Sequence, residues 1–201
     1  GGSRPIAFSK AVTLLKDLKL IDATITVNHA FGGDYEAVNV YSGLITAKEV
    51  LKADAAIICM GPGVVGTGTK WGFSGIEQGE IINAVNILEG KAITIPRITF
   101  RDRRDRHKGL SHHTLTILEK VALQPSVVAL PTLPEEESEL LKSQIREKRL
   151  RDQHTFKVID ATDVLKEAER LEIPLSTMGR SIEEEKYYFL TAGAAGILAA
   201  E

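Results

Sequence analysis

The sequence predicts an α/β protein with a doubly wound, mostly parallel sheet and helices on both faces, arranged as a three-layer sandwich. Short, β-branched apolar runs alternate along the 201 residues with longer segments of helical periodicity, which is typical of βα units around a parallel sheet. The chain carries no internal repeat and no linker-like segment, so we expect one domain over residues 1–201. The predicted strands are residues 23–28, 55–60, 92–99, 126–130 and 156–160, with a weaker candidate at 173–177.

The predicted helices lie between these strands. In the first helix, an alanine and three leucines of segment 11–18 repeat with the spacing of one buried face. Ser111 is the expected N-cap of another helix, because its hydroxyl can accept a hydrogen bond from a free amide of the first turn. The last helix contains small residues at 192–196 that allow close packing on another helix, of the same chain or of a second subunit. The helices are expected near residues 5–20, 35–53, 74–89, 111–123, 135–152, 161–171 and 183–199.

The composition indicates an ordinary globular protein. Hydrophobic residues make up 43% of the chain and charged residues 26%, with a formal net charge of -2, so we expect no general attraction to nucleic acid or to an anionic membrane. The sequence has no apolar run of about 20 residues and no signal-peptide pattern, and a cytoplasmic location is expected. The single cysteine, Cys59, excludes a disulfide within the chain and lies inside a predicted strand, where we expect a buried, inert thiol.

A glycine-rich segment follows the predicted strand at 55–60 and reads Gly-Pro-Gly-Val-Val-Gly-Thr-Gly-Thr over residues 61–69. Glycines let backbone amides approach a ligand closely, and threonine hydroxyls bind oxyanions, so the segment predicts an anion-binding loop. The alternative is a long surface turn. A nicotinamide or flavin site is not favoured, because the G-x-G-x-x-G match lacks the helix and acidic residue that this fingerprint requires, and Thr69 precedes Lys70, contrary to a P-loop. The expected ligand-binding residues are Gly61, Gly63, Gly66, Thr67 and Thr69.

A basic segment at 97–114 contains five arginines and three histidines. Arginine forks bind phosphate or carboxylate, and a helix beginning after Ser111 offers free amides to an anion. We therefore expect Arg101, Arg104, Ser111 and His113 to bind an anionic ligand. The alternative is an exposed loop whose aspartates pair with neighbouring arginines. Nucleic acid is not favoured as a partner, since only Phe100 is nearby for base stacking.

Polar segments follow three successive predicted strands, at 28–36, 61–69 and 97–114. Because the carboxyl ends of parallel strands meet at one edge of a sheet, these segments predict one pocket. The candidate general bases or acids are His29, His107 and His112, with Asp34 or Asp102 to orient them.

A divalent metal is also possible in this pocket. One of His112 and His113 could join His29, Asp34 or Glu36, although no zinc spacing is present. The metal and cofactor requirements stay open.

Two functions are compatible with these features. The first is an enzyme, a hydrolase or group transferase, that acts on a small phosphate- or carboxylate-bearing metabolite. The second is a non-catalytic module that senses a nucleotide or metabolite and dimerises through the helix containing 193–196. We favour the enzyme, because acids, imidazoles and arginines together exceed what anion binding needs. In both cases we expect a homo-oligomer.

Several stretches of the sequence resemble those of a known protein family. They lie at Gly1-Gly2 and at residues 5–9, 29–34, 39–42, 61–69, 72–75, 77–79, 97–114 and 178–180. In these strings the chain resembles the bacterial family catalogued as domain of unknown function 3866, over nearly its whole length. The resemblance implies no established activity, substrate or catalytic residue. Members of that family are longer and carry their Gly-Gly at the end of a preceding strand, which implies that this chain is the C-terminal part of a larger protein.

Overall fold

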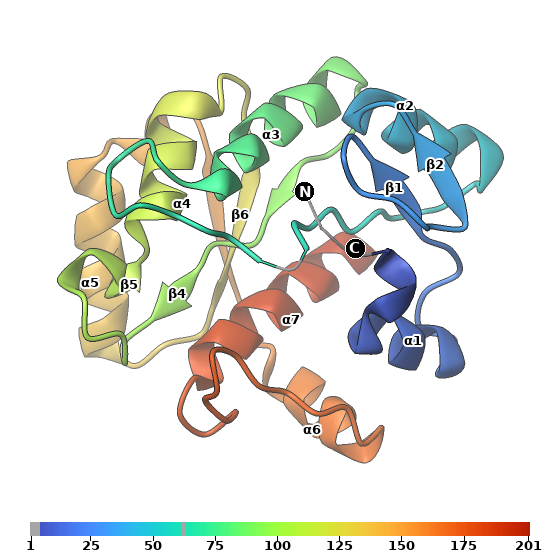
Figure 1. The fold of residues 1–201 in the computed structure, drawn as a ribbon. Helices are drawn as coiled ribbons and strands as arrows, with labels where there is room; N and C mark the ends of the chain where they lie inside the picture. Colours follow the sequence, from blue (N-terminus) through green and yellow to red (C-terminus); the bar gives the residue numbers. More distant parts are fainter. Residues whose placement is uncertain (1–4, 62) are drawn as a thin grey trace. The chain divides into compact units, whose positions relative to one another are not determined.

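The computed structural model has the predicted α/β fold, with helices and parallel strands in alternation (Figure 1). It describes residues 5–61 and 63–201, so the predictions made for Gly1, Gly2 and Pro62 lie outside the described residues. The chain divides into two compact units, Gly1–Val65 and Gly66–Glu201, and each is described here by itself.

The first unit contains a short parallel strand pair and two helices. Ser9 caps α1 by accepting a hydrogen bond from the amide of Val12, and Asn39 caps α2 in a reciprocal capping box with Ser42. A methyl group at Gly43 would lie 2.7 Å from Val27 Cγ1, so a glycine there lets α2 approach β1 closely. The elements are α1 (Lys10–Asp17), β1 (Ile25–Val27), β2 (Tyr35–Ala37) and α2 (Val40–Ile45), which a π-helical turn extends over Thr46–Val50.

The strand predicted at 55–60 is absent, and this corrects the prediction from the sequence. Residues 55–60 adopt no regular structure, the Ile57 side chain is 81% exposed, and Cys59 is exposed rather than buried. An apolar run forms a buried strand only where a neighbouring strand accepts its backbone hydrogen bonds. None of the described strands pairs with this run. The glycine-rich segment therefore does not begin at the end of a strand.

The second unit is built around a parallel sheet in the order β3-β6-β7. A separate antiparallel pair, β4 and β5, follows β3 along the chain. The strands are β3 (Ile93–Thr94), β4 (Ile98–Thr99), β5 (Gly109–Leu110), β6 (Val127–Pro131) and β7 (Thr155–Ile159). The helices are α3 (Glu77–Ile87), α4 (His112–Thr116, extended by a π-helical turn over Ile117–Val121), α5 (Glu135–Glu147), α6 (Thr162–Arg170) and α7 (Lys186–Ala200). Short 3-10 turns lie at Ser74–Ile76, Asp105–His107 and Leu150–Asp152, and another, in the first unit, at Ile6–Phe8.

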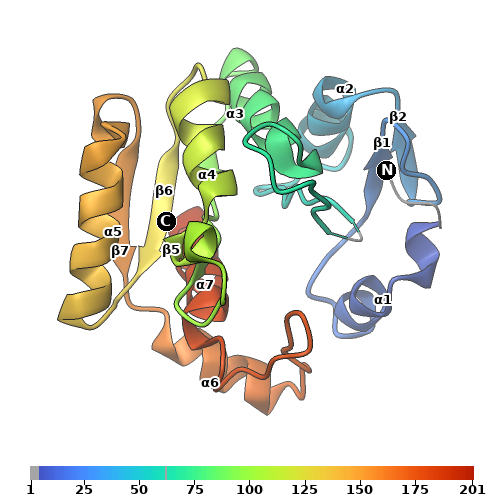
Figure 2. The ribbon, with the colours of Figure 1, turned by 60° about the vertical axis from the view of Figure 1, so that its left-hand side comes forward.

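Helices cover both faces of the β3-β6-β7 sheet. Alternate residues of β6 point to opposite faces: Val128 and Leu130 join a core with residues of α3, α4 and α5. Ala129 packs with Leu190 and Ala194 of α7 on the other face, and α7 runs along β6 (Figures 1 and 2). The described residues contain no helix with the length and apolar character needed to cross a bilayer.

Two strand predictions in this unit need correction. The predicted strand at 92–99 is divided into β3 and β4, which belong to different sheets. Pro96 lies between them and has no amide to continue the ladder. The weaker candidate at 173–177 forms no strand; its end makes only an isolated bridge between Thr177 and Arg180.

The small residues of α7 find a partner within the same unit. Gly193 is buried, and a methyl group there would lie 3.1 Å from Val164 and 3.2 Å from Ala161. Gly196 is exposed, with no atom within 4 Å of the position a methyl group would take. The close packing predicted for this helix is therefore made, at least at Gly193, to the segment that begins α6.

Substitutions at two adjacent leucines on α5 test how this helix packs on the core. Leu141 is 1% exposed, whereas Leu140 is 40% exposed. We expect Leu141→Ala to lower the free energy of unfolding by about 2 to 5 kcal/mol, because it removes buried methyl groups and leaves a cavity. Leu140→Ala should change it by less than about 0.5 kcal/mol. Urea denaturation measures both, and equal effects of the two variants would contradict the packing of α5.

Candidate functional site

Five of the predicted site residues lie on one loop that connects β3 to α4, and His112 and His113 begin α4. The five are Arg101, Asp102, Arg104, His107 and Ser111. The β4–β5 pair closes the base of this loop, with Ile98 opposite Leu110 and Thr99 opposite Gly109. At Gly109 the backbone has a φ of +68°, a conformation that favours glycine. A methyl group there would also lie 2.5 Å from Gln144 Oε1. The closed base holds the two ends of residues 100–108 together.

Asp102 is the anchor of this loop. Its side chain is 3% exposed, and its carboxylate accepts hydrogen bonds from the Arg104 amide and Nε, both at 3.0 Å, and from Arg104 Nη2 at 2.9 Å. Arg97 Nη2 lies 3.4 Å from Asp102 Oδ2. The hydrogen bonds from Arg104 hold the pKa of Asp102 far below its usual range.

This pairing changes the interpretation of two predicted residues. The Arg104 guanidinium binds Asp102 with two of its nitrogens, so that fork is occupied. Asp102 makes its side-chain hydrogen bonds to Arg97 and Arg104, which is the pairing of aspartate with neighbouring arginine that the sequence left open as an alternative. Both residues shape the loop.

Ser111 caps α4, as predicted, by accepting a hydrogen bond from the His113 amide at 3.3 Å. Its Oγ also lies 2.8 Å from His107 Nδ1. Ser111 and His107 are both buried. In this conformation the Ser111 hydroxyl fixes the His107 ring and does not face solvent.

Three histidine rings form a cluster at the start of α4. The ring centroids of His107, His112 and His113 are 4.9 Å, 5.2 Å and 4.2 Å apart in the pairs 107–112, 107–113 and 112–113. Phe73 stacks on His113, with centroids 4.1 Å apart. The adjacent His112 and His113 thus lie side by side, with their planes inclined by 56°.

The surroundings keep these imidazoles uncharged. Burial, with the guanidinium groups of Arg104 and Arg97, lowers the pKa of His107 to about 4. Burial and the other two rings lower the pKa of His113 to about 4, and burial, with Arg106 and Arg104, lowers that of His112. At neutral pH the cluster is therefore a set of neutral bases beside cations.

Two buried nitrogens near this cluster have no hydrogen-bond partner among the described residues. They are His112 Nε2 and Arg97 Nε. A different histidine of the same unit, His154, is satisfied on both ring nitrogens: Nδ1 accepts from the Ser126 amide and Nε2 donates to the Leu118 carbonyl. Buried polar atoms are usually paired, so the unpartnered Nε2 of His112 stands out among the buried ring nitrogens.

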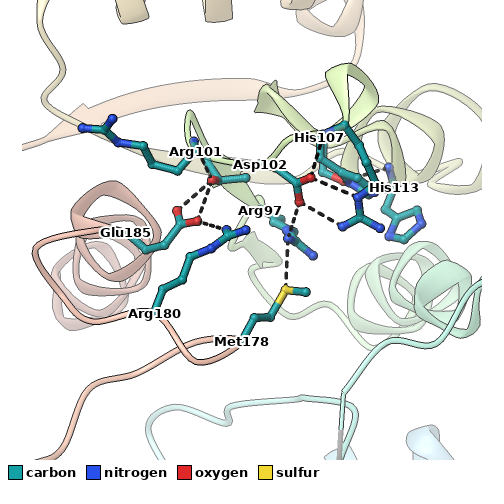
Figure 3. Close-up of polar contacts among 11 residues, drawn as sticks. Arg97, Arg101, Asp102, His107, His113, Met178, Arg180 and Glu185 are labelled. Atoms are coloured by element: carbon teal, nitrogen blue, oxygen red, sulfur yellow. Dashed lines mark hydrogen bonds and ion pairs between the residues drawn. The ribbon is translucent and has the colours of Figure 1, made fainter.

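The second half of the glycine-rich segment folds back beside the cluster. Gly66 pairs with Phe73 in an antiparallel bridge, and a methyl group at Gly66 would lie 3.7 Å from His113 Nε2. A methyl group at Gly68 would lie 3.4 Å from the Arg106 guanidinium. Figure 3 shows the histidines on the side of Asp102 away from Arg101.

The threonines of this segment hold its own turn together. The hydroxyl groups of Thr67 and Thr69 lie 3.0 Å apart, Thr67 Oγ1 donates to the Gly72 carbonyl, and Thr69 Oγ1 accepts from the Gly72 amide. A methyl group at Gly72 would lie 2.2 Å from Thr67 Oγ1, so only glycine fits. The predicted oxyanion donors are therefore engaged within the turn.

The remaining predicted residues lie in the first unit. His29, Gly61 and Gly63 are exposed. Asp34 accepts hydrogen bonds from Lys16 at 2.5 Å and from the amide and hydroxyl of Thr24, each at 2.8 Å, and these contacts, that of Lys16 first, lower its pKa to about 2. Asp34 thus ties α1 to the segment before β1. The single pocket predicted from the three polar segments stays a prediction.

Sequence reasoning missed a second buried carboxylate, Glu185, which is 4% exposed. It accepts hydrogen bonds from the Thr99 hydroxyl at 2.7 and 3.0 Å and from Arg180. Arg97 also reaches Met178, whose sulfur lies 3.5 Å from Arg97 Nη2 (Figure 3). Three consecutive glutamates before a helix are typical of a solvated helix start, so the sequence carries no signal that the third is buried.

Among the described residues, no group of three histidine, cysteine, aspartate or glutamate side chains is placed to hold a metal ion.

The chain belongs to the family described as protein of unknown function DUF3866, whose model matches residues 1–196. This confirms the resemblance found in the sequence. No curated protein and no solved structure matches the chain.

Substitutions at two nearby aspartates test whether Asp102 anchors the loop. Asp102→Asn removes a buried charge that faces two guanidinium groups, and we expect it to lower the free energy of unfolding by about 3 kcal/mol. The matched control is Asp105→Asn, whose side chain is 93% exposed and, among the described residues, forms an ion pair with Lys108 alone. It should cost less than about 0.5 kcal/mol. Urea denaturation at pH 7 gives both values. Equal stability of the two variants would show that Asp102 does not anchor the loop.

Proposed function

We propose that this protein is an enzyme, a hydrolase or group transferase that acts on a small phosphate- or carboxylate-bearing metabolite, with His112 as its general base or acid. The observation that carries the proposal is the unpartnered Nε2 of His112, on a ring surrounded by neutral imidazoles and by guanidinium groups. A buried ring nitrogen without a partner costs free energy in the folded state. A substrate or an attacking water that hydrogen-bonds to it would remove that cost.

The residues around His112 suit proton transfer near an anion. A neutral imidazole can take a proton from water or from an acceptor hydroxyl as that oxygen attacks the substrate, and can return it to the leaving group. Ser111 holds the His107 ring beside it. Arg106, whose charge helps to lower the pKa of His112, forms no ion pair with a described residue, so its fork is free to bind the charge of the substrate.

The cytoplasmic location, the bacterial origin and the homo-oligomeric state expected from the sequence are part of the same proposal. The composition of the chain supports the location, and the family resemblance supports the origin. The homo-oligomer rests on the small residues of α7, of which Gly196 is exposed. The glycine-rich segment enters the proposal through its backbone amides, because its threonine hydroxyls are engaged in the turn.

The test is turnover of a panel of phosphomonoesters, phosphodiesters, acyl esters and acyl phosphates, with and without divalent metals. We expect His112→Ala to lower kcat by about 100-fold or more on any substrate found, because general acid or base catalysis contributes that much. Lys166→Ala, an exposed change on α6, is the matched control and should keep the full rate. Added imidazole should restore part of the activity of His112→Ala.

An unchanged rate in His112→Ala would overturn this role. Tight binding of a nucleotide or metabolite with no turnover of any compound would favour the sensing module over the enzyme.

A further inference from the structure

A groove is lined in part by the anchored loop, and none of the histidines lines it. It has a volume of about 460 Å³ and is lined by Arg101, Arg103, Arg180, Glu183 and Glu184. This volume lies within the range of small-molecule sites. In Figure 3, Arg101 and Arg180 lie on one side of Arg97 and Asp102, and the histidines lie on the other.

A buried hydrogen-bond network forms the support of the groove. The Thr99 hydroxyl donates to Glu185 and accepts a hydrogen bond from the Arg101 amide at 3.2 Å. Glu185 in turn accepts from Arg180. Thr99 is 2% exposed and Glu185 is 4% exposed, so this network is fixed by packing. It holds Arg180 and the backbone of Arg101 in place before a ligand arrives.

The charges that line the groove do not neutralise one another. Glu183 accepts a hydrogen bond from the Ser181 hydroxyl, and Glu184 accepts one from the Ser181 amide at 2.9 Å. Within the described chain, neither carboxylate forms an ion pair with an arginine of the groove. The Arg101 and Arg103 side chains likewise have no ion-pair partner among the described residues. The groove therefore presents unpaired positive and negative groups to the same space.

Such a surface matches a ligand that carries both charges. Arginine forks bind a phosphate or carboxylate with two parallel hydrogen bonds, and glutamates bind a protonated amine. An anion alone would leave Glu183 and Glu184 unmatched and would be repelled by them. A cation alone would leave Arg101 and Arg103 unmatched and would be repelled by them.

We propose that this groove binds a small zwitterion, with its phosphate or carboxylate on Arg101 and Arg103 and its protonated amine on Glu183 and Glu184. This binding site goes beyond the proposed function, because no histidine lines the groove. The binding itself needs no catalytic step.

The test uses phosphoethanolamine, inorganic phosphate and ethanolamine as probes, with binding followed by the backbone amide NMR signals of residues 101–103 and 180–185. Phosphoethanolamine should bind the wild-type protein at least about tenfold more tightly than either single-charge probe, because hydrogen bonds to both charged groups add. Arg103→Ala should weaken phosphoethanolamine and phosphate alike. The double variant Glu183→Gln with Glu184→Gln should weaken phosphoethanolamine and leave phosphate as tight or tighter.

Arg149→Ala and Glu167→Gln are the matched controls, since both side chains are exposed and lie outside the groove. They should leave binding of every probe unchanged. The proposal is overturned if phosphoethanolamine binds no better than phosphate, if its signals lie outside the groove, or if the glutamate variant binds both probes as the wild type does.

A failure here is distinguishable from a failure of the proposed function. His112→Ala should bind phosphoethanolamine as the wild type does, because His112 does not line the groove. Binding of phosphoethanolamine by both proteins, with no turnover of any compound in the panel, would overturn the enzyme and keep the groove. Turnover of a compound in the panel by a wild-type protein that binds phosphoethanolamine no better than phosphate would overturn the groove and keep the enzyme.

Discussion

The contact between the buried Asp102 carboxylate and the arginines 97 and 104 is the interaction on which the rest of the site depends. A carboxylate that is almost fully removed from water is stable only if cations and amide donors replace its hydration. Arg104 supplies three donors from within the loop, and Arg97 adds a fourth from the residue before β4. The loop is thereby closed on itself, and His107 is brought beside His112 and His113 at the start of α4.

The same constraint separates residues that shape the site from residues that can bind. Some side chains form hydrogen bonds to neighbours in the protein and thereby shape the site. These are Arg104, Ser111 and the threonines of the glycine-rich turn. Arg180 is held by Glu185 at one end of the groove. The groups left over are the His112 Nε2 atom and the forks of the remaining arginines, and they define where chemistry and ligand binding are proposed.

Local features of the site could be predicted from the sequence, and features that depend on distant contacts could not. Ser111 was predictable as an N-cap because a capping hydroxyl acts within three residues, and the pairing of Asp102 with Arg104 spans only two. The burial of Glu185 depends on Thr99, 86 residues away. The apolar run at 55–60 matches a buried strand in composition, but a strand also needs a partner, which composition does not specify.

In the fold, too, local features could be predicted from the sequence and features that depend on distant contacts could not. The β-branched runs at β6 and β7 and the helices between them were predicted from periodicity, and the structure confirms the α/β class. The separation of β3 from β4 depends on a single proline and on the later strand that pairs with β4. The family model, which matches residues 1–196, agrees with the strings recognised in the sequence.

The anchored loop and the start of α4 hold three uncharged imidazoles beside guanidinium groups. The most direct measurement is an NMR titration of the histidine ring signals of the wild-type protein between pH 3 and pH 8. We expect His107 and His113 to titrate near pH 4, and His112 to titrate below its ordinary value, so that all three rings are neutral at pH 7. Titration of these rings near pH 6.5, the ordinary value of a solvated histidine, would contradict it.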